Sequence, residues 1–114
     1  MRFSTSLKKN HEFRRLYNRG KSSATPNLAV YCRRNGRGEN RLGITVSTKL
    51  GGAVVRNLLR RRIKEAYRIN EHRLKSGYDI VVVARVRARG AHFRVLEADL
   101  LRLLNRLGVS GDAK

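Results

Sequence analysis

The residues with the clearest chemical potential lie in positions 49–68, KLGGAVVRNLLRRRIKEAYR. This stretch has seven lysines and arginines and one acidic residue, Glu65. Good helix formers without proline follow its two glycines, which predicts a helix from about residue 53 to about residue 73. At roughly 100° per residue, one arc of about 140° collects polar side chains that could bind dense negative charge. They are Arg56, Asn57, Arg60, Arg61, Lys64 and Arg68.

The opposite side of this predicted helix is apolar and is expected to pack against a core. It consists of Val55, Leu58, Leu59, Ile63, Ala66 and Ile69. The basic side has two interpretations, because most charged faces are simply solvated. A solvated face usually mixes signs, whereas here like charges repeat four residues apart, as at Arg56 and Arg60. Since this spacing is repulsive, we favour a polyanionic partner that relieves it.

The composition of the whole chain indicates the same kind of partner. The 114 residues carry a net charge of +19, from 27 lysines and arginines against 8 acidic residues. Charge of this size predicts binding to nucleic acid or to an anionic membrane. We disfavour the membrane, because no apolar run approaches the roughly 20 residues that span a bilayer. The basic helix also has no Trp or Phe on its apolar side.

Cysteine usage and the N-terminus bear on the compartment. Cys32 is the only cysteine, which excludes a disulfide within the chain and a cysteine-based zinc site. It alternates with Leu28 and Val30 and is expected in the core. Residues 1–10 are charged and lack the apolar segment of a signal peptide, so the expected compartment is the cytoplasm.

Several elements precede the basic helix. Asn10 can cap a helix that runs to about residue 18 and stops at Gly20. Residues 27–33 and 41–47 alternate apolar and polar side chains, which predicts two strands joined as a hairpin by a long glycine-rich loop. Residues 21–26 leave open a further strand, since KSSATP has poor strand propensity.

The elements after the basic helix complete a fold. Residues 78–84 form an apolar run that predicts a strand buried on both faces and paired parallel with an earlier strand. A final helix over about residues 92–107 carries a leucine stripe toward the core. The order αβββαβα predicts a single domain over residues 1–114 of the α+β class, a two-layer sandwich with a small mixed sheet. Residues 1–9 and 109–114 are expected to be a flexible arm and tail.

Three aromatic residues suggest a second surface. Phe13 and Tyr17 share one face of the first helix, and Tyr31 points outward from the first clear strand. Aromatic rings beside arginines suit single-stranded nucleic acid, because bases stack on the rings while cations follow the phosphates. The alternative is that Phe13 and Tyr17 are ordinary core contacts of a short helix. The residues alone leave both interpretations open.

Nothing in the sequence predicts catalysis or metal binding by the chain itself. The eight acidic residues form no cluster in sequence of the kind that holds divalent ions. His11, His72 and His92 are isolated among polar residues and are expected at the surface. Gly51 and Gly52 precede a helix but lack the spacing of a phosphate-binding loop.

The basic stretch also resembles a known family. The run Lys49-Leu50-Gly51, Ala53-Val54, Arg56-Asn57, Arg60-Arg61 and Lys64-Glu65 is similar to the RNR signature of the protein subunit of bacterial ribonuclease P. The third position of that signature is usually Arg and is Leu58 here, which we expect to remove one peripheral cation. The resemblance extends from about Leu7 to the last helix.

The resemblance implies a left-handed crossover at the basic helix, in a fold of ribosomal-protein type. It implies an accessory subunit of an endonuclease whose catalytic RNA, with Mg²⁺, hydrolyses the 5′ leader from precursor tRNA. No cofactor would be bound by the protein alone, and one protein would bind one RNA. The residues expected to bind the catalytic RNA are Lys49, Gly51, Arg56, Asn57, Arg60, Arg61, Lys64 and Arg68. Those expected to bind the leader are Phe13, Arg14, Tyr17, Tyr31 and Arg33.

Two other classes of protein share some of these features. A small ribosomal or other structural rRNA-binding protein would share the charge, but such proteins more often carry a lysine-rich extended tail. A stand-alone nuclease would need a carboxylate site. The signature disfavours both.

Overall fold

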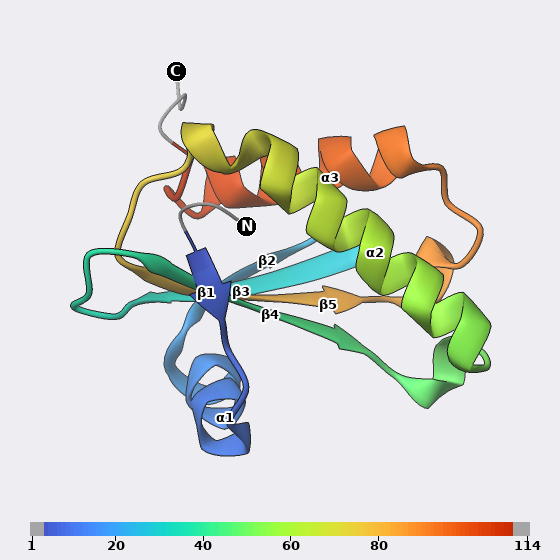
Figure 1. Cartoon of the computed structure of the whole chain (residues 1–114), viewed down its shortest axis with the longest axis horizontal. Helices are drawn as coiled ribbons and strands as arrows, with labels where there is room; N and C mark the ends of the chain where they lie inside the picture. The colour runs from blue at the N-terminus through green and yellow to red at the C-terminus, as the bar shows by residue number, and fades with distance from the viewer. Residues whose placement is uncertain (1–3, 111–114) are drawn as a thin grey trace.

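The computed structural model describes residues 4–110, which form one sheet and three α-helices (Figure 1). In chain order the elements are β1 (Ser4–Ser6), α1 (Asn10–Arg19), β2 (Lys21–Ala24), β3 (Leu28–Arg34), β4 (Asn40–Val46), α2 (Ala53–Asn70), β5 (Tyr78–Ala84) and α3 (Phe93–Arg106). Short 3-10 helices lie at η1 (Thr48–Leu50), η2 (Glu71–Arg73) and η3 (Val86–Ala88). The predicted basic helix is thus confirmed as α2 with its continuation η2.

The sheet has the order β1-β4-β5-β3-β2. β5 runs parallel to β4, which confirms the predicted parallel pairing, and antiparallel to β3. The predicted hairpin of β3 and β4 is wrong, because β5 lies between them. β5 is apolar on both of its faces and gains most from the central position. The hairpin of the sheet is instead formed by β2 and β3, so residues 21–24 are a strand despite their poor propensity.

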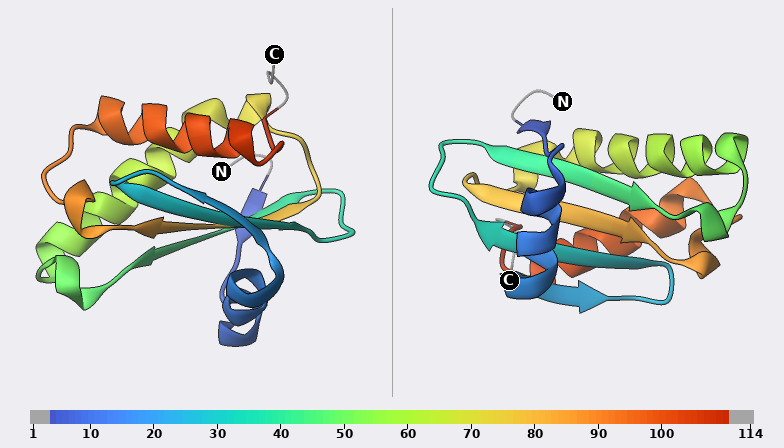
Figure 2. Two further views of the ribbon diagram at one scale, coloured as in Figure 1. Left: turned by 180° about the vertical axis from the view of Figure 1, so that it is seen from behind. Right: turned by 90° about the horizontal axis from the view of Figure 1, so that it is seen from below.

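The helices divide between the two faces of the sheet. α2 and α3 cover one face, and α1 lies alone on the other, which the two-layer prediction did not include (Figures 1 and 2). Seen from the side of α1, β4 and β5 both run to the right, β5 lies below β4, and α2 lies behind the sheet, above β4 (Figure 2, right). This path makes the β4–α2–β5 crossover left-handed, as the resemblance implied.

The main core lies between the sheet and the pair α2 and α3. The inward side chains of β3 are Leu28, Val30 and Cys32, which are essentially inaccessible to solvent. They pack in one cluster with residues such as Ile63 of α2 and Leu100 of α3. The prediction of Cys32 as a core residue is confirmed, and burial raises the pKa of its thiol.

Both ends of the described chain make contacts with the rest of the fold. Ser4–Ser6 pair with β4 as an edge strand, and the amide of the buried Leu7 donates to the carbonyl of Leu42 at 2.8 Å. Val109 and Ser110 are also buried, and the Val109 carbonyl accepts from the amide of Lys75 at 2.7 Å. Residues 4–7 and 109–110, which were expected in the arm and the tail, are thus paired with the rest of the fold. Of both predictions, residues 1–3 and 111–114 lie outside the described part of the chain.

A close contact with Gly43 seats α1 on the sheet. A Cβ atom at Gly43 of β4 would lie 2.6 Å from Cζ of Phe13 and 2.7 Å from Cε1. We expect Gly43→Ala to lower the free energy of unfolding by about 1–3 kcal/mol, because the ring or the helix must move. Urea denaturation measures this effect. Gly38→Ala is the control, because a Cβ there meets nothing within 4 Å; equal stability of the two variants would contradict the proposed contact.

Candidate nucleic-acid interface

The outer face of α2 is basic, but its register differs from the prediction. Leu59, Ile63 and Ala66 are buried as expected, whereas Leu58 and Ile69 are 41% and 38% exposed. Tyr67 is fully buried although it falls between Arg56 and Arg60 on the helical wheel, and its hydroxyl lies 2.8 Å from Oγ of Ser4. The buried face is thus rotated toward the edge of the basic arc.

This rotation changes the place of two kinds of side chain. Leu58 stands on the exposed basic face of α2 instead of at the edge of the packing face. Arg56 and Arg60 are half-buried, whereas Asn57, Arg61 and Lys64 are exposed. Contacts of α2 with α3, with β4 and with Ser4 of β1 decide which side of the helix is covered, and the helical period alone does not contain that information.

The cations of α2 differ in how they are held. Arg56 Nε donates to the Gly51 carbonyl at 3.1 Å, and Arg60 Nη1 donates to Asn57 Oδ1 at 3.1 Å. Arg68 makes two bonds to the carboxylate of Glu65, at 2.9 and 2.6 Å. The Arg68 hydrogen bond lowers the pKa of Glu65, aided by the positive charge. Arg68 is therefore partly neutralised within the helix.

Arg61 and Lys64 are the cations of α2 most available to an external anion. Within residues 4–110, neither side chain makes a hydrogen bond or an ion pair. Both are exposed on adjacent turns of the helix. Two like charges in this position are favourable only when an anion binds to them.

The start of α2 adds backbone donors to this face. No side chain caps the first turn, so its amides remain available to an anion. Gly51, just before the helix, has a φ of 138° that other residues rarely adopt. The neighbouring Lys49 is exposed in η1. The predicted RNA-binding residues therefore extend from η1 along α2 to Arg68 in its last turn.

The second surface lies on the other side of the sheet, beside α1. The rings of Tyr17 and Tyr31 meet edge to face, with centroids 5.0 Å apart, and the Tyr17 hydroxyl lies 3.1 Å from Oγ1 of Thr45. A surface cleft of about 450 Å³ opens here. Its lining is Asn10, Phe13, Arg14, Tyr17 and Thr45.

The two interpretations of the aromatic residues turn out to be compatible. Phe13 and Tyr31 are partly buried against a small cluster of Leu7, Leu16 and Val81. Phe13 also lines the cleft, and Tyr17 is exposed. An aromatic ring that packs against a core on one side is held in place and can still contact a ligand on its other side.

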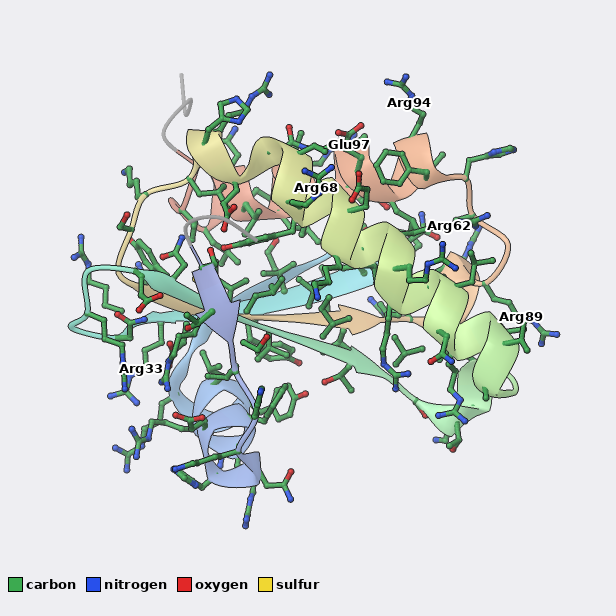
Figure 3. The ribbon with its side chains drawn as sticks, viewed as in Figure 1. Arg33, Arg62, Arg68, Arg89, Arg94 and Glu97 are labelled. Carbon is green, nitrogen blue, oxygen red and sulfur yellow. The ribbon has the colours of Figure 1, made fainter. Side chains whose placement is uncertain are left out.

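Two of the predicted leader residues, Tyr31 and Arg33, do not line this cleft. Tyr31 contacts the ring of Tyr17, which does line it. Arg33 is exposed on the same side of the sheet as α1, in the row next to Tyr31 and opposite Asp79 (Figure 3). Thr45, by contrast, was missed. Its place could have been predicted, because the strand alternation puts Thr45 on the face opposite Leu42 and Val46.

An ion-pair network also missed from the sequence fastens α1 beside the cleft. Arg41 of β4 binds both carboxylate oxygens of Asp79 on β5, at 2.8 and 2.7 Å, and Oε2 of Glu12 on α1 at 2.5 Å. Asn35 Nδ2 donates to Asp79 Oδ1 at 2.9 Å. The three charged side chains are about one-sixth exposed. No sequence period links these distant positions.

The network predicts a loss of stability in acid. Burial is the largest influence and raises the pKa of both carboxyls, but the hydrogen bond and charge of Arg41, with Asn35 at Asp79, leave the pKa of Glu12 and Asp79 lowered. The folded state therefore releases these protons more readily than the unfolded state, so the contribution is present above about pH 4 and lost below it.

We expect Asp79→Asn to reduce the free energy of unfolding near pH 6 by roughly 1–3 kcal/mol. The difference from wild type should shrink as the pH falls to about 3, where the unfolded carboxyls are protonated. Urea denaturation at several pH values measures it. A difference independent of pH would show that the charge of Asp79 contributes nothing.

Residues 4–110 bring together no group of three or more histidine, cysteine or acidic side chains that could hold a metal ion. His11, His72 and His92 are exposed, as predicted. Among the same residues, no helix combines the length and apolar composition needed to cross a bilayer.

The fold and the two surfaces define a small basic α+β protein with a left-handed crossover and two candidate nucleic-acid-binding faces. The profile of the Ribonuclease P family matches residues 1–108. The ribonuclease P protein component of Clostridioides difficile is 44% identical over 105 residues, covering 91% of this chain and 92% of that protein. The protein component of Alkaliphilus metalliredigens is 39% identical over 107 residues, covering 94% and 96%.

Solved structures agree with the sequence relatives. The ribonuclease P protein of Staphylococcus aureus superimposes with a TM-score of 0.85 at 35% identity, covering 92% of this chain and 96% of that one. The protein from Thermotoga maritima gives 0.82 at 34% identity, covering 89% and 96%. The chain belongs to the family of bacterial ribonuclease P protein components, which are tRNA-processing subunits. The resemblance seen at residues 49–65 is confirmed, and the ribosomal-protein alternative is not supported.

Proposed function

We propose that this chain binds the catalytic RNA of ribonuclease P through α2 and the 5′ leader of precursor tRNA through the cleft beside α1. The RNA carries out the Mg²⁺-assisted hydrolysis, and the protein contributes no catalytic residue and no cofactor of its own. One protein binds one RNA, in the cytoplasm. The observation that carries the proposal is the pair of separate surfaces, one basic and one aromatic, on opposite sides of a single sheet.

The basic face of α2 is suited to lower the repulsion between two RNA molecules. A catalytic RNA and a precursor tRNA repel each other, and a protein of net charge +19 lowers that repulsion. Arg61 and Lys64, which have no partners within residues 4–110, and the open amides at the start of α2 are suited to phosphates. Binding releases counterions, so affinity should fall steeply with salt.

The cleft beside α1 is suited to distinguish precursor tRNA from mature tRNA. Mature tRNA lacks the leader, so contacts to the leader favour the substrate over the product. Tyr17 in the cleft, and Tyr31 whose ring meets it edge to face, are the candidates for stacking, and the exposed Arg14 of the cleft can follow the phosphates. Thr45 in the cleft is four residues before Lys49. An RNA strand that leaves the cleft and follows β4 would therefore reach the basic face at Lys49.

A binding titration tests the proposal. The complex of this protein with a bacterial ribonuclease P RNA should bind precursor tRNA more tightly than mature tRNA, and the RNA alone should show a smaller preference. Equal affinity for the two tRNAs, with and without the protein, would contradict the proposed role of the cleft.

A further inference from the structure

A depression on the outer face of α2 is lined by both apolar and basic side chains. The docking of phosphates would explain the basic side chains but not the apolar ones. Its volume is about 410 Å³, within the roughly 300–1,000 Å³ of small-ligand pockets. Leu58 of α2 and Phe93, the first residue of α3, form its apolar wall. Arg61, Arg62 and Lys64 stand around that wall.

The apolar wall is preformed. Phe93 is partly buried, with its inner side packed against the main core, and so presents only its outer side. Leu58 is 41% exposed in the middle of a strongly basic helix face. Exposure of this apolar surface to water is unfavourable, so covering it with a ligand would be favourable.

The surrounding charge is positive. Arg62 Nη1 donates to the Ala91 carbonyl at 2.9 Å, which holds the guanidinium between α2 and the segment before Phe93; Figure 3 shows Arg62 on this side of α2. Arg61 and Lys64 have no intramolecular partner in the described residues. The acidic Glu65 also lines the depression, but Arg68 compensates its charge at 2.6 Å.

From this arrangement we propose that the depression binds one unpaired base of the catalytic RNA, against Leu58 and Phe93, while Arg61 and Lys64 contact its flanking phosphates. A nucleotide combines a flat apolar base with an anionic backbone, which matches an apolar wall inside a basic rim. The inference rests on the proposed function and adds to it a contact that depends on an unpaired base as well as on phosphate charge.

Salt dependence distinguishes this contact from a purely electrostatic one. We expect Leu58→Ala to weaken binding of a ribonuclease P RNA about 5- to 20-fold at every salt concentration, with the slope of log K against log salt unchanged. Arg61→Ala should make that slope shallower by about 0.7–0.9. Leu58→Met retains an apolar side chain of similar size and should bind almost as wild type does.

Val95 provides the matched control. It is an apolar residue of α3 that is 45% exposed, about as much as Leu58 at 41%, and does not line the depression. Val95→Ala should leave RNA affinity unchanged. Chemical probing with dimethyl sulfate should find an unpaired base of the RNA that wild type and Val95→Ala protect and that Leu58→Ala leaves reactive.

Two results would overturn the inference while leaving the proposed function intact. One is wild-type affinity of Leu58→Ala for an RNA that the wild-type protein binds and activates. The other is self-association of the protein that Leu58→Arg abolishes, which would assign the depression to a second copy of the chain. Failure of the wild-type protein to bind any ribonuclease P RNA would overturn the proposed function and this inference together.

Discussion

Alanine at both Arg60 and Arg61 is expected to weaken binding of the catalytic RNA at least about 100-fold at near-physiological salt. A hydrogen bond to a charged group contributes roughly 1.5–3 kcal/mol, and the double variant removes two candidate phosphate contacts. Arg61 has no partner within residues 4–110, and Arg60 is oriented only by the exposed Asn57. Neither side chain contributes to the core, so the fold should persist.

Filter binding or fluorescence titration across a range of salt concentrations measures this effect. The slope of log K against log salt should become shallower by about 1.4–1.8, because two fewer counterions are released. Alanine at Arg102 and Arg106, both exposed on α3, removes the same net charge and is the control. If both double variants lost affinity equally, net charge alone would explain binding and α2 would have no special role.

Alanine at Tyr31 is expected to reduce the preference for precursor over mature tRNA about 5- to 150-fold, since stacking contributes roughly 1–3 kcal/mol per base. The loss should be at the upper end, because Tyr31 also supports the ring of Tyr17 at 5.0 Å. The affinity for the catalytic RNA should not change, because Tyr31 lies on the face of the sheet opposite α2.

Competition between labelled precursor and mature tRNA for the protein–RNA complex measures this preference. Tyr31→Phe retains the ring and should behave almost as wild type does, since the Tyr31 hydroxyl makes no hydrogen bond within the described residues. An equal loss of affinity for both tRNAs would show that Tyr31 stabilises the protein without contacting the leader.

Local patterns were sufficient to predict most of the elements. The helical period and the two glycines placed α2 correctly, and the alternation at Leu28, Val30 and Cys32 identified the inward face of β3. The left-handed crossover came from the family resemblance, since pattern reasoning alone favours the right-handed form. Local signals sufficed for α2 and β3 because each of these two features depends on residues close in sequence.

Strand pairing, and burial that depends on residues far apart in sequence, were harder to predict from the sequence. The hairpin prediction failed because strand order depends on β5, whose central position is decided by contacts with strands far away in sequence. The same limit applies to β1 and to Tyr67, which meet through a hydroxyl contact at Ser4. The Arg41 network joins three separate elements, so only the assembled sheet reveals it.

The cleft illustrates a different limit. A short helix with Phe13, Leu16 and Tyr17 on one face has the same pattern whether the aromatic rings are buried or line a groove. The structure distinguishes them by position: Leu16 is buried, whereas Tyr17 stands at the margin of α1 beside Thr45. Only the placement of α1 on the sheet decides which rings remain accessible.

The central claim is that this chain assists a catalytic RNA, and reconstitution tests it most directly. The protein is mixed with a bacterial ribonuclease P RNA at low Mg²⁺ and near-physiological salt, and leader removal from precursor tRNA is followed. We predict strong stimulation over the RNA alone, lost with alanine at Arg60 and Arg61. No stimulation of several such RNAs, together with tight binding to ribosomal RNA, would contradict the account.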